Sequence, residues 1–333
     1  MRTVLVTGGA GVIGSHLVDR LLEDGVAVRV LDNLSTGSLE NLQVAAGQHL
    51  RNGSTNGSRL EIIIGDIRDR ELLRKALRNV KYVFHMAALP WRAAAEVGPG
   101  DIHSVNVDGT LNVLHGALTE GVWRVVFASC GSVYGSSAGG SLSEESAVRP
   151  ASLFSASKVA AESYCRAFYA RHQLDTVVLR YFSVYGPRQK KESGAIIPRL
   201  IDALQQRRPF VSQIEGNADD FVYVDDAVGA ALAAGRAPRA AGRVINVGSG
   251  ELIDIGDVLG ILADLMRTSV VSSGPRNPET QPQRRAADMT QAAEVLGFVP
   301  GVSLVAGLAH VVRCLSEPEE SERSALAPVG RDD

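Results

Sequence analysis

The chain has 333 residues, 45% of them hydrophobic and 21% charged, which is the composition of an ordinary globular protein. Its 34 Lys and Arg nearly balance 37 Asp and Glu, and a net charge of −3 argues against nucleic acid or a membrane as partner and for a small-molecule ligand. Three widely spaced cysteines without a CxxC pair indicate neither a disulfide framework nor a metal site. Neither a signal peptide nor an apolar run of about 18 residues is evident, so we expect a cytoplasmic protein.

Short runs rich in Val and Ile alternate with segments of helical period from residue 3 to about 185. The expected strands are TVLVT, AVRVLD, LEIIIGD, YVFHMAA, RVVFAS and TVVLRYF. Helices are expected between them, for example at 14–23 and, after a cap at Asp69, at 70–78. Strands that alternate with helices predict an α/β fold with a Rossmann-type, doubly wound parallel sheet.

Three glycines, Gly8, Gly11 and Gly14, lie between the first strand and the first helix. Such spacing allows a tight turn, a close approach of the backbone to a pyrophosphate, and close packing of helix on strand. Asp32 ends the next strand, where its carboxylate can accept hydrogen bonds from ribose hydroxyls and would repel a 2′-phosphate. The sequence therefore predicts NAD rather than NADP. Asp66, in GDIRD, is expected near the adenine or, alternatively, as a helix cap.

Nine motifs together carry a family resemblance: TGGAGVIG, DNLSTG, GDIRD, HMAA, NVDGTLNVL, SVYG, SASKVAAE, RYFSVYGPRQ and FVYVDDAV. Over about residues 3 to 300 the chain resembles the extended short-chain dehydrogenase/reductases, especially the UDP-glucose 4-epimerase-like epimerases and dehydratases. The resemblance implies that a sugar hydroxyl is oxidised transiently. A Ser or Thr and a Tyr-x-x-x-Lys pair remove its proton while hydride passes to the nicotinamide. The oxidised sugar then epimerises, loses water or loses carboxylate, and the hydride returns.

The resemblance also implies which residues bind the cofactor and how the chain assembles. A homodimer is expected through helices near 103–120 and 154–171. The implied cofactor-binding residues are Gly8, Gly11, Val12, Ile13, Gly14, Asp32, Asn33, Ser35, Thr36, Gly37, Asp66, Ile67, Ala87, Ala88, Asn106, Lys158 and Tyr181.

The catalytic positions of the family are partly changed in this chain. The Ser/Thr position is Cys130, the Tyr position is Phe154 and the Lys position is Lys158. A phenyl ring cannot accept a proton, so Phe154 is not the base. Lys158, next to an apolar ring and a cationic nicotinamide, is expected to have a lowered pKa and to be the base itself.

Alternatives to this prediction remain open at the level of sequence. The thiol of Cys130 would be the base if Lys158 and the nicotinamide lowered its pKa. Tyr134 would serve only if its ring turned toward the sugar. A catalytically inactive subunit that binds NAD is the alternative from another functional class.

Further changes affect the expected substrate site. The family's RYFN reads RYFS here, which puts Ser183 in place of the asparagine, and Asp219 stands in place of an arginine. A carboxylate there is predicted to repel a pyrophosphate, with Arg188 or Arg199 as a compensating cation. A nucleoside or a nucleotide sugar is therefore expected, preferably without a diphosphate, and an ordinary UDP-sugar is the alternative. The expected substrate-binding residues are Trp91, Cys130, Gly131, Ser132, Phe154, Ser183, Arg188 and Arg276.

The reaction outcome and the domain division are also predicted. Gly131 and Ser132 replace the acidic pair of the dehydratases, which favours epimerisation slightly over dehydration. Residues 1–185, with 220–247 returning to them, are expected to form the NAD-binding domain. Residues 186–219 and 248–315 are expected to form a smaller, mixed α/β substrate-binding lobe, and 316–333 a disordered tail.

Overall fold

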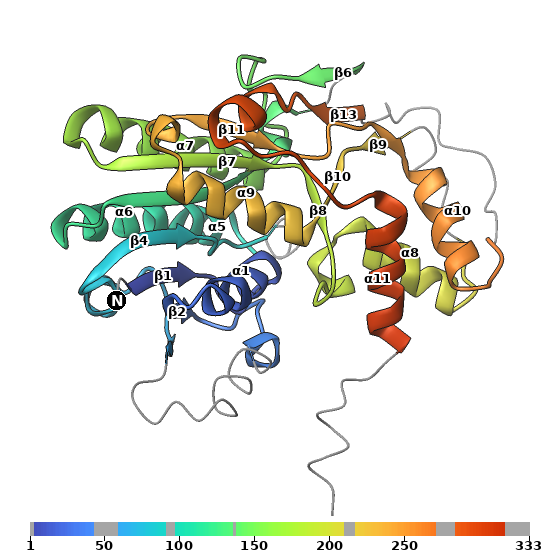
Figure 1. Ribbon diagram of the computed structural model, residues 1–333, viewed down its shortest axis with the longest axis horizontal. Helices are drawn as coiled ribbons and strands as arrows, with labels where there is room; N and C mark the ends of the chain where they lie inside the picture. Colours follow the sequence, from blue (N-terminus) through green and yellow to red (C-terminus); the bar gives the residue numbers. More distant parts are fainter. Residues whose placement is uncertain are drawn as a thin grey trace, which may run out of the picture.

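The computed structural model describes residues 3–42, 59–90, 97–135, 138–209, 217–270 and 284–316. Its main feature is a seven-stranded sheet in the order β11-β7-β5-β4-β1-β2-β3, in which every neighbouring pair is parallel (Figure 1). The doubly wound fold predicted from the sequence is therefore confirmed. The strands are β1 (Thr3–Thr7), β2 (Ala27–Asp32), β3 (Leu60–Ile64), β4 (Val80–His85), β5 (Arg124–Cys130), β7 (Asp175–Tyr181) and β11 (Val244–Val247).

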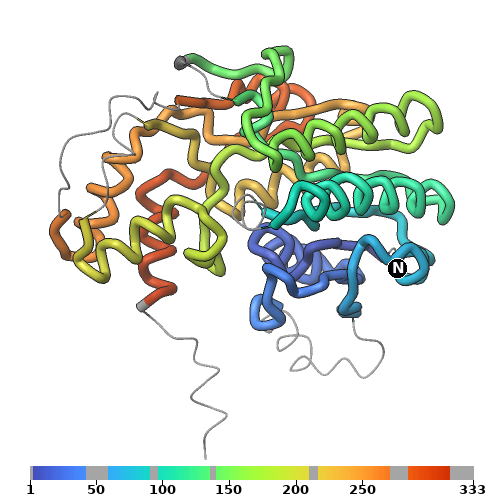
Figure 2. The backbone as a smooth tube through the Cα atoms, turned by 180° about the vertical axis from the view of Figure 1, so that it is seen from behind, coloured from blue at the N-terminus to red at the C-terminus, as the bar shows by residue number. Residues whose placement is uncertain are grey.

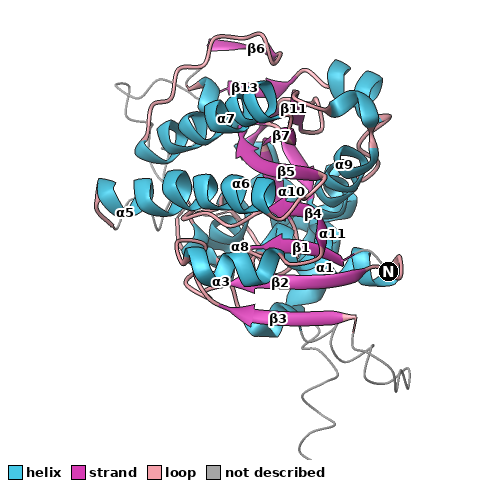
Figure 3. Cartoon of the chain, turned by 90° about the vertical axis from the view of Figure 1, so that its left-hand side faces the viewer, coloured by secondary structure: helices cyan, strands magenta, loops and turns pink. Residues whose placement is uncertain are grey.

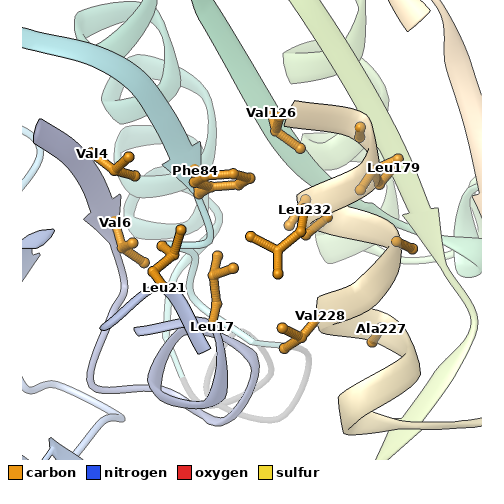
Figure 4. Close-up of a cluster of buried hydrophobic side chains, with 14 of the residues drawn as sticks. Val4, Val6, Leu17, Leu21, Phe84, Val126, Leu179, Ala227, Val228 and Leu232 are labelled. Carbon is orange, nitrogen blue, oxygen red and sulfur yellow. The ribbon is translucent and has the colours of Figure 1, made fainter. Parts of the chain in front are cut away.

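Helices cover both faces of this sheet (Figure 3). One face packs on α1 (Val12–Glu23) and α9 (Val224–Arg236), and Figure 4 shows Val4 and Val6 of β1 pointing toward Leu17 and Leu21 of α1. The other face packs on α3 (Arg70–Leu77), α6 (Gly109–Thr119) and α7 (Leu153–His172). Because both faces are buried, the strands consist of nearly continuous apolar runs.

Capping residues determine where two of the helices begin. Asp69 Oδ1 accepts hydrogen bonds from the backbone N–H groups of Glu71 and Leu72, both at 3.0 Å, which confirms it as the cap of α3. Ser152 and Ser155 form a capping box at the start of α7. A short helix, α5 (Pro99–His103), and a π-helical turn, η2 (Ser104–Asp108), lead into α6.

A second group of elements stands at the carboxyl ends of the parallel strands (Figures 1 and 2). It contains a four-stranded sheet in the order β12-β9-β13-β6 and a two-stranded β8-β10 pair. These strands are β6 (Ala138–Leu142), β8 (Ser183–Tyr185), β9 (Ala218–Asp219), β10 (Phe221–Tyr223), β12 (Ile253–Asp254) and β13 (Arg284–Ala287). The helices are α8 (Ile196–Gln205), α10 (Ile255–Leu265) and α11 (Leu304–Ser316), which share an apolar core. The predicted domain boundaries stay a prediction, and the expected tail from 317 onward lies outside the described residues.

One buried carboxylate joins these two groups of elements. Asp220, which is fully buried, accepts hydrogen bonds from Ser249 Oγ at 2.7 Å, Gly250 N at 2.9 Å and Ala287 N at 3.0 Å. The loop after β11 is thereby tied to β13 of the smaller sheet. None of the helices in the described ranges has the length and apolar character needed to cross a bilayer.

Candidate active site

A cavity of about 1630 Å³ lies where the parallel strands end and the smaller sheet begins. Its wall combines the glycine turn after β1, the end of β5, the start of α7 and residues of the second lobe. In the described ranges no group of three or more His, Cys, Asp or Glu side chains is arranged to hold a metal ion. The lining residues that matter below are Gly8, Gly11, Val12, Ile13, Gly14, Thr36, Ala88, Cys130, Ser132, Phe154, Lys158, Tyr181, Ser183, Lys191, Arg199, Asp202, Arg208, Asp219 and Arg285.

The glycine turn has the geometry that a dinucleotide pyrophosphate requires. Gly8 has φ +70°, and a Cβ there would lie 2.6 Å from Ala87 N. A Cβ on Gly14 would lie 2.1 Å from the carbonyl oxygen of Gly8. Gly11 precedes α1 without a side-chain cap, which suits a helix start whose N–H groups bind an anion. The turn therefore fits NAD by close packing as well as by sequence.

Asp32 stands at the end of β2 and holds the glycine turn. Its Oδ2 accepts a hydrogen bond from Ala10 N at 2.9 Å, and its Oδ1 accepts one from Leu34 N at 2.8 Å. The carboxylate keeps lone pairs that can accept hydrogen bonds from ribose hydroxyls. Beside it, Ser35 N donates to Asn33 Oδ1 at 3.0 Å, and Gly37 packs against the backbone of Ala10.

Asp66 does not act as a helix cap. Arg68 Nη2 lies 2.7 Å from its Oδ2, and Asn33 donates to the same oxygen at 2.9 Å. The hydrogen bond from Arg68 is the largest cause that lowers the pKa of Asp66 to about 2. The capping alternative is wrong because Asp69 caps α3, while Ile67 is buried against Gly109.

Asn106 fixes the edge of the cavity. Its Oδ1 accepts from Leu89 N at 2.8 Å, and its Nδ2 donates to Ser157 Oγ at 2.9 Å, which ties the segment after β4 to α7. Several predicted cofactor residues lie around the cavity without belonging to its described lining. These are Asp32, Asn33, Ser35, Gly37, Asp66, Ile67, Ala87 and Asn106.

Lys158 lies in the cavity wall with its amine buried. Nζ donates to the carbonyl oxygen of Ala128 at 2.7 Å, and the side chain is 4% exposed. The ring centroids of Phe127 and Phe154 lie 4.9 Å and 5.8 Å from Nζ. Burial lowers the pKa of Lys158 to about 8, although Cys130 and Glu162 act in the opposite direction. The direction is the one expected from the sequence.

The two alternative bases are placed less favourably. The Sγ of Cys130 lies 2.9 Å from Ser132 Oγ, and burial raises the pKa of the thiol, outweighing the opposing effect of Lys158. Burial therefore opposes the acidic thiol that the sequence left open as an alternative. Tyr134 is 3% exposed, and its hydroxyl donates to Asn246 Oδ1 at 2.7 Å while it accepts from Arg180 at 2.9 Å. Its ring does not turn toward the cavity.

The remaining predicted substrate residues divide into three groups. Ser132, Phe154 and Ser183 line the cavity. Gly131 is buried behind it, where a Cβ would lie 3.1 Å from the ring of Phe182. Arg188 does not line the cavity, because its guanidinium is bound at 2.7 Å to Asp19, a residue of α1. Trp91 and Arg276 lie outside the described residues.

The charge of Asp219 is compensated in the fold. Arg285 Nη2 lies 3.0 Å from Asp219 Oδ2, and Ser183 Oγ donates to the same oxygen at 2.7 Å. The carboxylate therefore faces the cavity as half of an ion pair, and the repulsion of a pyrophosphate predicted from sequence loses its main support. Sequence reasoning missed Arg285, for which RRAAD offered no motif.

The chain matches the NAD dependent epimerase/dehydratase family over residues 4–248. It belongs to this family. This NAD-dependent epimerase/dehydratase is 36% identical to a UDP-glucose 4-epimerase of Mycolicibacterium smegmatis. The match covers 94% of this chain and 97% of the relative. It is 33% identical to a dTDP-glucose 4,6-dehydratase of Streptomyces griseus, over 93% of this chain and 92% of the relative. The structure of MoeE5 in complex with UDP-glucose and NAD superimposes with a TM-score of 0.79 at 32% identity, covering 97% of this chain and 99% of that one.

Proposed function

We propose that this NAD-dependent enzyme oxidises a sugar hydroxyl transiently and that Lys158 takes the hydroxyl proton. The observation that supports this most is a buried amine, with a pKa lowered to about 8, in the same cavity as the glycine turn. The family's tyrosine position is Phe154, which cannot take the proton. NAD, when bound in the glycine turn, supplies the hydride acceptor.

Residues of this chain keep Lys158 ready to accept the proton of the sugar hydroxyl. The carbonyl of Ala128 holds the amine, and burial of the side chain disfavours its charged form. A neutral Lys158 accepts the proton when the hydroxyl is oxidised and returns it when the sugar is reduced again. The amine is regenerated in each cycle, so no net proton acceptor is needed.

We propose a sugar nucleotide with at least one phosphate as the substrate. Arg199 and Arg285 line the part of the cavity formed by the second lobe, and Arg285 neutralises Asp219. Planar guanidinium groups suit phosphate oxygens. The relatives named above for UDP-glucose and dTDP-glucose agree with this class. A free nucleoside, one of the two substrate classes expected from the sequence, is the alternative.

Epimerisation is favoured over dehydration. The departure of a hydroxyl needs an acid, and the positions after Cys130 are Gly131 and Ser132. Of the three carboxylates in the described cavity wall, Asp202 and Asp219 are bound to basic side chains, and Glu192 is the candidate acid for the alternative outcome, dehydration. Mass spectrometry of the product distinguishes the outcomes, because an epimer keeps the substrate's mass and dehydration removes one water.

A homodimer through α6 and α7 is part of the proposal. Leu118 on α6 and Tyr164 on α7 are 36% and 39% exposed, which suits a contact between helix faces. Analytical ultracentrifugation tests it, and a monomer at micromolar concentration would contradict it.

The catalytic proposal is tested by incubating the NAD-loaded protein with UDP-sugars, nucleoside monophosphate sugars and free nucleosides. Absorbance at 340 nm reports the reduced cofactor, and NMR reports the product. We expect turnover with a phosphate-bearing substrate. Turnover with free nucleosides alone would overturn the substrate proposal, and no turnover with any class would favour the inactive NAD-binding subunit.

A further inference from the structure

A buried ion pair adjoins the amine of Lys158. Glu162 follows Lys158 by one turn on α7, and Arg180 reaches it from β7. Arg180 Nη2 lies 2.7 Å from Glu162 Oε2, and Arg180 Nε lies 3.1 Å from Oε1. Both side chains are at most 3% exposed. Charges buried this deeply are stable only when each has its partners.

A short segment of β5 holds the amine and the carboxylate separately. The carbonyl of Ala128 accepts from Lys158 Nζ, and the hydroxyl of the next residue, Ser129, donates to Glu162 Oε1. Among the described residues, the hydrogen bonds found for Glu162 go to Arg180 and Ser129 and not to Lys158. The amine and the carboxylate are thus neighbours without being bound to each other.

Arg180 is held in this position from its other side. Its Nη1 donates to the hydroxyl of Tyr134 at 2.9 Å, and that hydroxyl donates to Asn246 Oδ1 at 2.7 Å. The guanidinium carbon also lies 4.8 Å from the ring centroid of Tyr134. The guanidinium is therefore held on one side by Glu162 of α7 and on the other by Tyr134, whose hydroxyl is bound in turn to Asn246 of β11.

We propose that Arg180 is a positioning residue which, together with Ser129, binds Glu162 and prevents this carboxylate from forming an ion pair with Lys158. The inference rests on the proposed function, in which Lys158 must be neutral to take a proton. A carboxylate bound directly to the amine would stabilise the ammonium and remove the base.

The other titratable and charged groups around Lys158 do not perform this role. Burial raises the pKa of both nearby thiols, so they stay protonated, and burial lowers the pKa of the imidazole on β4 to about 3, so it stays neutral. Glu162 is then the negatively charged group among these described neighbours of Lys158. The groups concerned are His85 of β4, Cys130 of β5, Glu162 and Cys165 of α7, and Arg180 of β7.

The test measures the ionisation of Lys158 by NMR of protein labelled with ¹³C-lysine. The chain has only five lysines, and a Lys158→Arg variant assigns the signal. In Arg180→Gln the pKa of Lys158 should rise by about one unit, because Glu162 is released. The double variant Arg180→Gln/Glu162→Gln should return it to the wild-type value or below, and Arg180→Lys should shift it less than Arg180→Gln.

Ser129→Ala provides a milder variant that changes no charge. It should raise the pKa of Lys158 by a smaller amount. If Arg180→Gln does not fold, the pKa of Lys158 in Ser129→Ala tests the inference instead. An unchanged pKa of Lys158 in the folded variant overturns the inference. If the pKa shifts as expected while Lys158→Met retains turnover, the positioning of Glu162 stands and the proposed catalytic role of Lys158 fails.

Discussion

Arg285 Nη2 lies 3.0 Å from Asp219 Oδ2, although the two residues are 66 positions apart in the chain. The pairing of β13 with β9, in which Arg284 stands opposite Ala218, brings them together. Both side chains are mostly buried, so the pair is less screened by solvent than a surface ion pair. A carboxylate can therefore stand in the cavity wall without presenting an uncompensated negative charge.

Arg285→Gln should weaken the binding of UDP by at least about tenfold, or about 1.4 kcal/mol. The variant removes a cation and leaves Asp219 as an uncompensated negative charge beside the phosphate. Isothermal titration with UDP and with uridine measures this effect. The double variant Asp219→Asn/Arg285→Gln should recover part of the affinity, and an equal loss for uridine would show that the pair does not act on the phosphate.

Lys158→Met should reduce turnover by about 10² to 10⁴-fold, the usual contribution of a positioned acid or base. Steady-state kinetics on the NAD-loaded variant measures it, with bound NAD quantified separately. Lys75→Met is the matched control, because Lys75 lies on α3 with its side chain 56% exposed. Turnover within a few-fold of wild type in Lys158→Met would contradict the assignment.

The turnover rate should rise with pH through a midpoint near 8. Below that value Lys158 is mostly protonated and cannot accept a proton, and above it the neutral amine predominates, because burial lowers its pKa to about 8. A kcat profile between pH 6 and 10 measures this limb. A rate that is flat across this range or falls toward high pH would exclude the amine as base.

Phe154→Tyr should raise turnover at pH 7 by about tenfold. The new phenol would stand on the same helix face as Lys158, whose Nζ lies 5.8 Å from the present ring centroid. A nearby ammonium lowers the pKa of a phenol and makes it a usable base. Phe154→Leu keeps the position apolar and should show no increase, and a gain in both variants would point to cavity size instead.

His85 should make the protein less stable as the pH falls below 6.5. It is 1% exposed, and burial, followed by the charge of Lys158, lowers its pKa to about 3. The native imidazole stays neutral while the unfolded chain binds a proton, so stability present above pH 6.5 is lost toward pH 3. From pH 7 to 5.5 the loss should be about 1 kcal/mol. Urea unfolding of wild type and His85→Gln checks this, since the difference between them should narrow with acid.

The fold and the dinucleotide turn could be predicted because their signals are local. Gly8 and Gly14 are needed within one strand-turn-helix segment, and Asp69 caps the helix that follows it directly. The parallel sheet could be predicted for the same reason, because each strand is an apolar run of typical strand length. Lys158 and Phe154 could also be placed on one helix face by their spacing of four residues.

The charge balance of the cavity could not be predicted, because it depends on pairings between distant segments. The partner of Asp219 is supplied by β13, and Arg188 is withdrawn from the cavity by Asp19 of α1. The high pKa of the Cys130 thiol likewise reflects burial, which the sequence does not report. Tyr134 faces Asn246 rather than the cavity because β11 lies beside β7 in the sheet.

Asp220 also has a consequence for the size of ligand that the protein accepts. Its hydrogen bonds to Ser249, Gly250 and Ala287 join the large sheet to β13, the strand that carries Arg285. These hydrogen bonds connect the strand that carries that guanidinium to the sheet that carries the glycine turn. We therefore expect the protein to discriminate between ligands by the distance between the two groups that they must reach.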